Sequence, residues 1–207
     1  MERTYDEIVT AMQKLNYTFF AGEKNLNFIW ERTSDEITNK FTDFLHIAYQ
    51  SQGENLVFTI PATTKPGIKG SIDSPVTYEG VTGTAIIIPG QYHASWEFID
   101  TPVPPTGKHY PLDKEYFRQV KPVNYWRDGN KDLVVDHVQE QDNQIFGTHW
   151  HKMSNPGASG FGVNNWSLGC MGAEQPEFIK ILPLVRSSVP LYGSVFTGTV
   201  LESKDFV

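Results

Sequence analysis

The sequence predicts a β-rich α+β fold, arranged as one domain of a 207-residue chain. Three observations carry this prediction. Segments with strand-like patterns outnumber segments with helical spacing of apolar residues. Turn-forming residues separate the strand-like segments at short intervals. A chain of this length can bury enough surface to fold without a disulfide, and it contains a single cysteine.

Helices are predicted at residues 5–15 and 176–185, while residues 41–48 fit a short helix or a bent strand. In both predicted helices the apolar residues share one face. They are Ile8, Met12 and Leu15 in the first helix, and Phe178, Ile179, Leu182 and Val185 in the second.

Strands are predicted where apolar and β-branched residues alternate, or form a short run, between turn residues. These segments cover residues 25–31, 55–60, 83–88, 91–98, 120–127, 133–135, 146–151 and 192–201. Pro89-Gly90 separates two of these strands and predicts a hairpin there. Thr63-Thr-Lys-Pro-Gly67 has the composition of a turn.

The charge balance excludes some classes of partner. The net charge is −7 and the pI is near 5.3, whereas nucleic-acid binding needs a basic face. The longest apolar run, residues 84–89, is too short to span a bilayer, so we expect no membrane insertion. No basic region followed by an apolar stretch opens the chain, so we expect no signal peptide.

The only cysteine is the strongest sign of chemistry. Cys170 ends the run Trp166-Ser-Leu-Gly-Cys170, nineteen residues after His151, and the segment between them is rich in Gly, Ser, Asn and Pro. A thiol becomes nucleophilic as a thiolate, which needs a base or a positive neighbour. A buried, inert cysteine is the alternative interpretation, because free cysteine is among the most buried residue types.

The stretch Phe146-Gly-Thr-His-Trp-His-Lys152, followed by Asn164-Asn-Trp-Ser-Leu-Gly-Cys170, resembles the active-site region of the L,D-transpeptidase catalytic domain. That family has a histidine, a variable loop of about this length, and then Ser/Thr-His-Gly-Cys. Ser167, Gly169 and Cys170 match this pattern. Leu168 replaces the family's second histidine, and the two residues after the cysteine also differ.

A divergent branch of this family, known from bacteriophage and bacterial genomes, is more similar still. It shares the turn Thr63–Gly67, the Gly-Thr-Ala-Ile strand that leads to Pro-Gly-Gln-Tyr (Gly83–Tyr92), and the run Tyr125–Asp132. The resemblance covers residues 55–185. It implies an L,D-transpeptidase-like β-sandwich or barrel with few short helices at residues 55–207, with residues 1–54 as a helix-and-strand annex.

The chemistry expected of the pair is acyl transfer. Cys170 would attack an acyl carbonyl, and His151 would take the thiol proton and return a proton to the leaving amine. The backbone N–H groups of Gly169 and Cys170 would stabilise the oxyanion. Ser167 would orient His151 or bind the substrate. A thiolate paired with an imidazolium should also be alkylated rapidly at mildly acidic pH.

Three neighbours allow more than one interpretation. His149 would share a strand face with His151 and is the second candidate base, or a hydrogen-bonded neighbour of the site. His149, His151 and Cys170 together would also suit zinc. Trp150 and Trp166 would line a substrate groove or pack in the core.

An acidic segment suggests a second site. Asp128, Asn130, Asp132 and Asp136 place oxygen ligands at positions 1, 3, 5 and 9, as in calcium loops, but the glycine and glutamate of an EF-hand are missing. A solvated turn is the alternative.

The function expected from these features is that of a peptidoglycan-acting cysteine enzyme, a transpeptidase or peptidase of stem peptides with an endolysin-like role. The resemblance implies a phage-encoded protein that is made in the host cytoplasm and reaches the cell wall in a virion or after lysis. The reaction requires no cofactor, and other virion proteins are expected partners. The alternative is a non-catalytic virion or wall-binding protein that retains the fold.

Overall fold

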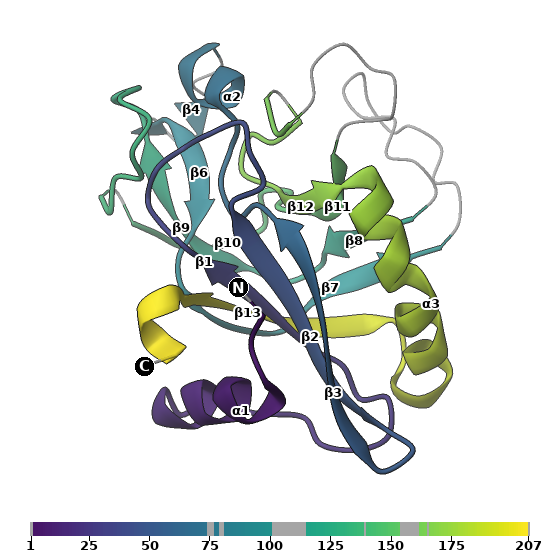
Figure 1. The fold of residues 1–207 in the computed structure, drawn as a ribbon. Helices are drawn as coiled ribbons and strands as arrows, with labels where there is room; N and C mark the ends of the chain where they lie inside the picture. Colours follow the sequence, from purple (N-terminus) through teal and green to yellow (C-terminus); the bar gives the residue numbers. More distant parts are fainter. Residues whose placement is uncertain are drawn as a thin grey trace.

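The computed structural model describes residues 2–73, 77–78, 81–100, 115–138, 140–153, 162–164 and 166–206. Their main feature is an eight-stranded sheet in the order β12-β11-β8-β7-β13-β1-β2-β3 (Figure 1). Its pairs are antiparallel except β1–β13 and β11–β12, which are parallel. The strands are β1 (Asn27–Arg32), β2 (Asp43–Ser51), β3 (Glu54–Ala62), β7 (Gly90–Ile99), β8 (Tyr116–Gln119), β11 (Trp150–Met153), β12 (Met171–Glu174) and β13 (Val195–Glu202).

The two edges of this sheet meet and nearly close it into a barrel. Thr63, which follows β3, forms an antiparallel bridge with Gly172 of β12. The Thr63 N–H donates to the Gly172 carbonyl at 2.8 Å, and the Gly172 N–H donates back at 3.1 Å. This bridge attaches the predicted turn Thr63–Gly67 to the strand that begins directly after Cys170.

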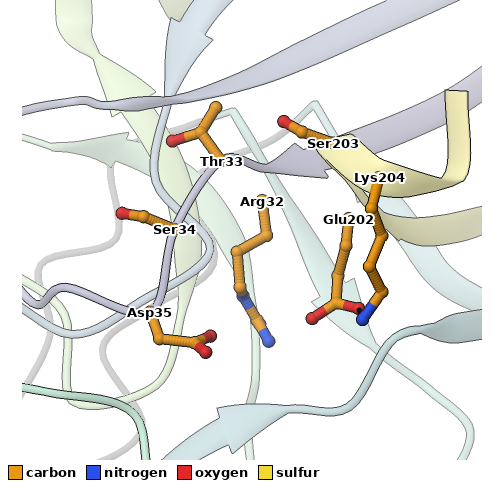
Figure 2. Close-up of a pocket in the computed structure, with 7 residues that line it drawn as sticks. All are labelled: Arg32, Thr33, Ser34, Asp35, Glu202, Ser203 and Lys204. Carbon is orange, nitrogen blue, oxygen red and sulfur yellow. Dashed lines mark ion pairs between the residues drawn. The ribbon is translucent and has the colours of Figure 1, made fainter. Parts of the chain in front are cut away.

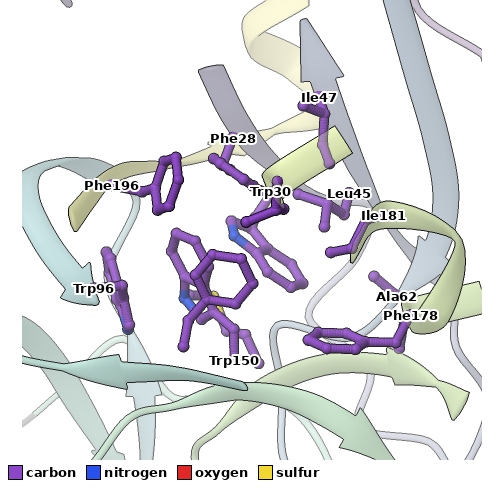
Figure 3. Packing of buried hydrophobic residues seen from close by; sticks show 14 of the residues in the cluster. Phe28, Trp30, Leu45, Ile47, Ala62, Trp96, Trp150, Phe178, Ile181 and Phe196 are labelled. Atoms are coloured by element: carbon purple, nitrogen blue, oxygen red, sulfur yellow. The ribbon is translucent and has the colours of Figure 1, made fainter. Parts of the chain in front are cut away.

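An aromatic core fills the concave side of the sheet (Figure 3). Trp150 lies at its centre, stacked on Trp96 with ring centroids 4.4 Å apart and tilted against Trp30 at 5.5 Å. Helix α3 (Gln175–Tyr192) packs against this core through one apolar face. The buried residues of that face are Phe178, Ile181, Leu182 and Val185.

Smaller elements surround the sheet. A three-stranded sheet has the order β10 (Gln141–Gln144), β9 (Val123–Asp128), β6 (Thr84–Ile87), and β4 (Thr77–Tyr78) pairs with β5 (Val81–Thr82). Helix α1 (Tyr5–Lys14) begins with a capping box between Thr4 and Glu7 and buries Ile8, Ala11 and Met12. Helix α2 (Ile68–Asp73) follows the Thr63–Gly67 turn, and a 3₁₀ helix (Ser203–Phe206) follows β13. No helix in the described part of the chain has the length and apolarity needed to cross a membrane.

The β-rich α+β prediction is confirmed, and several finer predictions are wrong. Pro89-Gly90 does not form a hairpin, because β6 pairs with β9 in the small sheet while β7 pairs with β8 and β13 in the large one. Residues 1–54 are not an annex, because β1 lies in the middle of the main sheet and β2 forms a hairpin with β3. Residues 133–135 make only an isolated bridge through Val134, whereas the strand alternative for residues 41–48 is confirmed from Asp43 onward, where β2 begins.

Candidate functional site

The candidate site lies where β11 and β12 run side by side. Their parallel register pairs Trp150 with Met171, and both of these side chains are buried in the core. Side chains alternate between the two faces of a strand, so the residues next to this pair face the other way. The same register places His151 beside Gly172, and the Met171 N–H donates to the His149 carbonyl at 3.0 Å. The fold therefore places Cys170 beside the backbone of residues 147–149, directly before the strand that carries His151.

Cys170 is a neutral thiol in this arrangement. Its Sγ donates a hydrogen bond of 3.5 Å to the carbonyl oxygen of Gly147, and no hydrogen bond joins it to either imidazole among the residues described. Burial raises the pKa of the thiol to about 11, although the nearby backbone N–H of His149 acts in the opposite direction. The resting site thus holds S–H rather than a preformed thiolate.

The tautomer of His151 is set by its own neighbour. Its Nδ1 lies 2.7 Å from the carbonyl oxygen of Lys152, and a carbonyl can only accept, so the proton is on Nδ1. The lone pair is then on Nε2, which is buried and has no hydrogen-bond partner in the described chain. Burial also lowers the pKa of this imidazole, which keeps it neutral at pH 7. His151 is therefore a neutral base whose accepting nitrogen is unused.

His149 has the opposite tautomer. Its Nδ1 accepts a hydrogen bond of 3.2 Å from the backbone N–H of Gln119, so in the neutral ring the proton is on Nε2. Burial, with smaller contributions from His151 and Arg118, lowers the pKa of His149 to about 4. Its ring packs edge-on against Tyr116 at 5.5 Å. His149 can thus donate from Nε2 but is poorly placed to act as a base.

Ser167 and Gly169 do not have the roles predicted for them. The Ser167 hydroxyl donates to the carbonyl oxygen of Cys170 at 2.7 Å and accepts from the Gly169 N–H at 3.1 Å. This serine therefore stabilises the turn before β12 and does not orient His151. The Gly169 N–H is therefore not free for the predicted oxyanion, and oxyanion binding by the Cys170 N–H stays a prediction.

Close backbone contacts explain the glycines of this region. Gly169 has φ +132°, and a Cβ there would lie 2.7 Å from the carbonyl oxygen of Ala85 on β6. A Cβ on Gly67 would lie only 2.0 Å from the carbonyl oxygen of Asn164. We call the segment that leads to Cys170, described at residues 162–164 and 166–170, the cysteine loop. The Thr63–Gly67 turn contacts it through Asn164, and the small sheet of β10, β9 and β6 contacts it through Gly169.

Asp43 anchors that turn and is not among the residues that the sequence predicts for the site. Its carboxylate accepts from the Thr64 N–H at 2.9 Å and from the Thr64 hydroxyl at 2.8 Å, and it pairs with Lys65 at 3.3 Å. Asp43 and Lys65 are both almost fully buried. One signal in the sequence points to such a partner. Lys65 is the only charged residue of the motif Thr63–Gly67, and a lysine that becomes buried needs an acidic partner elsewhere in the chain.

The two tryptophans beside the site have different environments. Trp150 is 1% exposed and packs in the barrel core, so it cannot contact a substrate, and its predicted substrate-binding role is wrong. Trp166 is half-buried near the start of the turn that leads to Cys170. Substrate binding by Trp166 stays a prediction.

The metal predictions are not supported by the geometry. In the described chain, one group of three His, Cys, Asp or Glu residues brings its ligand atoms within 4.8 Å of one another, and it is Asp35, His137 and Glu202. The proposed zinc ligands His149, His151 and Cys170 do not form such a group.

The acidic segment behaves as a turn. Asn130 Oδ1 accepts from the Asp132 N–H at 2.9 Å, and Asp132 Oδ1 accepts from the Val134 N–H at 2.9 Å. Burial and the charges of Asp136 and Asp132 raise the pKa of Asp128 to about 6. In the described chain the carboxylates of Asp128, Asp132 and Asp136 do not form a group with ligand atoms within 4.8 Å of one another, and calcium binding by this segment stays a prediction.

The thiol pKa makes a prediction about alkylation. At pH 8 the folded protein should react with iodoacetamide about 100-fold more slowly than the unfolded chain, because two pKa units separate the buried thiol from an ordinary one. This reverses the expectation drawn from the sequence. Mass spectrometry of the labelled peptide measures both rates. Rapid labelling at pH 6, slowed by the His151→Ala substitution, would instead support the thiolate–imidazolium pair expected from the sequence.

The raised pKa of Asp128 makes a second prediction. A carboxyl whose folded pKa lies above its unfolded value stabilises the fold below the unfolded pKa and loses that contribution as the pH rises through about 6. Asp128→Asn should therefore gain about 1–2 kcal/mol at pH 7 and little at pH 4. Urea titrations at the two pH values test this. A calcium-dependent rise in Tm of the unsubstituted protein would argue for a metal site instead.

Comparisons of the chain with protein-family models, with curated proteins and with solved structures give no match.

Proposed function

We propose that the protein is a cysteine acyl-transfer enzyme of the L,D-transpeptidase type that acts on peptidoglycan stem peptides. One observation carries the proposal: His151 donates from Nδ1 to the Lys152 carbonyl, which leaves a buried, unpartnered lone pair on Nε2, in the strand that pairs with the one directly after Cys170. A proton acceptor without a partner in a buried setting is unfavourable for stability and suits a catalytic base.

The proton balance of the reaction follows from these two side chains. Cys170 Sγ attacks the acyl carbon while its proton passes to His151 Nε2, which produces a tetrahedral oxyanion. The C–N bond then breaks, the leaving amine takes the proton from Nε2, and a thioester remains on Cys170. Water or an acceptor amine attacks the thioester and gives its proton to Nε2. That proton returns to the thiol when the acyl group leaves.

The neutral resting state is compatible with this sequence of steps. General-base catalysis needs an unprotonated imidazole and a thiol within its reach, and it does not need a preformed ion pair. The resting hydrogen bond from Cys170 to Gly147 would be exchanged for one to His151 when a substrate binds. Catalytic hydrogen bonds are often formed only in the complex.

The substrate class rests on the resemblance of the chain to the phage and bacterial branch of the family. The shared motifs meet in space: the Thr63–Gly67 turn bridges to Gly172, and Thr84–Ile87, directly after Gly83, pairs with Tyr125–Asp128 in the small sheet that contacts Gly169. This supports a common arrangement around Cys170, and with it a stem-peptide substrate reached in a virion or after lysis.

A second candidate function is a non-catalytic virion or wall-binding protein. Two observations favour it: Leu168 stands where the family has a histidine, and the Gly169 N–H is bonded to Ser167 instead of being free for an oxyanion. Such a protein would bind the cell wall without changing it.

Incubation with purified sacculi separates the two candidates. The enzyme should release or cross-link muropeptides, which liquid chromatography with mass spectrometry detects, and Cys170→Ala should abolish the change while Ser187→Ala, on α3, should not. Sacculus binding that is equal in the unsubstituted protein and in Cys170→Ala, with no new muropeptide in either, would overturn the enzymatic proposal in favour of wall binding.

A further inference from the structure

A second polar site lies where β1 and β13 end together. A pocket of about 240 Å³ opens there, lined by Arg32, Asp35, Glu202 and Lys204 with the serines Ser34 and Ser203 (Figure 2). Its volume is below the range of about 300–1,000 Å³ that drug-sized ligands occupy, so it suits a much smaller molecule.

Arg32 is the unusual member of this pocket. Its side chain is almost fully buried, with Nε donating to the Thr64 hydroxyl at 3.0 Å and Nη2 to the Ile87 carbonyl at 2.7 Å. Nη1 has no hydrogen-bond partner, and no ion pair to Arg32 is formed among the residues described. The buried Nη1 donor is therefore unsatisfied, which is unfavourable, although the charges of Asp43, Asp35 and Glu202 favour the guanidinium from nearby. An anionic group at Nη1 would complete this position.

The walls of the same pocket carry negative charge. Figure 2 shows the guanidinium of Arg32 between the carboxylates of Asp35 and Glu202. His137 lies 3.3 Å from Asp35, and the Asp35, His137 and Glu202 ligand atoms lie within 4.8 Å of one another. These carboxylates would repel a phosphate or sulfate dianion, but they would attract an ammonium group.

We propose that this pocket binds a free α-amino acid, whose carboxylate meets Arg32 Nη1 and whose ammonium group meets Asp35 and Glu202. Charge-assisted hydrogen bonds at both ends would satisfy the unpartnered Nη1 donor, and the ammonium group would compete with His137 for Asp35 and with Lys204 for Glu202. Nη1 is not open to solvent in the unliganded arrangement. Lys204, which is 75% exposed and pairs with Glu202 at the rim, is the side chain that would move to admit the ligand.

This pocket is separate from the cysteine site. The small sheet lies between them, and its side chains alternate: Ala85 faces Gly169 of the cysteine loop, whereas Ile86 packs with Ile37 on the other side. On that other side the Trp126 ring also stacks on His137 at 4.1 Å. Amino-acid binding therefore does not depend on the proposed catalytic function.

Thermal shift and calorimetric titration of the full chain test the proposal, with L-alanine, D-alanine and glycine as probes. At least one probe should raise Tm in a saturable way, while sodium acetate and ethylamine at equal concentration should not, because each carries only one of the two charges. Asp35→Asn and Glu202→Gln should each weaken binding at least tenfold. Cys170→Ala should bind normally.

Three outcomes would overturn the proposal. The first is no saturable binding of any of the amino acids. The second is an equal effect of acetate, which would mean a simple anion site. The third is a Tm increase with zinc chloride alone that His137→Ala abolishes, which would mean a metal site. Arg32→Gln should also weaken binding if this variant folds. If it does not fold, Asp35→Asn and Glu202→Gln still decide the test, because both side chains reach the surface.

Discussion

Substituting glutamine for His151 should lower the rate of the proposed acyl transfer by about 10²–10⁴-fold, which is the usual contribution of a general base. Glutamine can still donate to the Lys152 carbonyl, but it cannot take up the thiol proton. Because burial lowers the pKa of His151, the decrease of kcat/KM on the acidic side should also fall below the ordinary imidazole pKa of 6.5. Muropeptide product formation as a function of pH measures both effects.

His149→Gln is the matched control. The amide of glutamine can accept from the Gln119 N–H and donate in the direction of Nε2, so both hydrogen-bonding roles of His149 are kept. Its rate should stay within about tenfold of the unsubstituted enzyme. The opposite ranking, with His149→Gln the more damaging change in two equally stable variants, would transfer the role of base to His149.

Substituting alanine for Glu31 should destabilise the fold by about 3–5 kcal/mol, because it removes the shared partner of a buried polar network. The Glu31 carboxylate is 1% exposed and binds Arg3 at 2.6 Å, His46 Nε2 at 2.9 Å and the Ser203 hydroxyl at 2.6 Å. His46 is itself fully buried and would lose this partner. Urea or thermal unfolding measures the loss.

An exposed pair supplies the control for Glu31. Glu97→Ala removes the partner of Arg118 at the surface, where such pairs contribute only about 0–1 kcal/mol.

The dependence of stability on pH gives a second check of the role of Glu31. Hydrogen bonds lower the pKa of Glu31, so its contribution is complete above the ordinary value of 4.5 and is lost as the pH falls below it. Equal losses in the two variants would show that the buried network does not contribute specifically.

The alternation of strand side chains accounts for what the sequence could predict about the site. If His149 and His151 share a face, the residue between them must point the other way, and Trp150 does so into the core. The parallel register then places His151 beside Gly172, two residues after Cys170. The inward position of Trp150 could have been deduced from the same rule.

The hydrogen-bond partners of the site residues cannot be predicted from local sequence patterns, because these partners lie far away in the sequence. The tautomer of His149 is set by the backbone N–H of Gln119, and the Thr63–Gly67 turn is anchored by the carboxylate of Asp43. Pro89-Gly90 predicts a hairpin because hairpins are the common short connection between strands. The chain instead passes from one sheet to another there, a choice decided by the pairing of β6 with β9.

The central strand pair sets the order in which the molecule can be assembled. β1 is hydrogen-bonded to β13 in parallel register, so its second edge stays unsatisfied until β13 has also left the ribosome. Contacts of such long sequence separation slow folding, because the entropy of closing a long loop is lost before the contact is gained. The unfinished β1–β2–β3 sheet would expose Phe28 and Trp30 during this interval. Nascent chains that stop before Val195 should therefore need chaperones and aggregate without them.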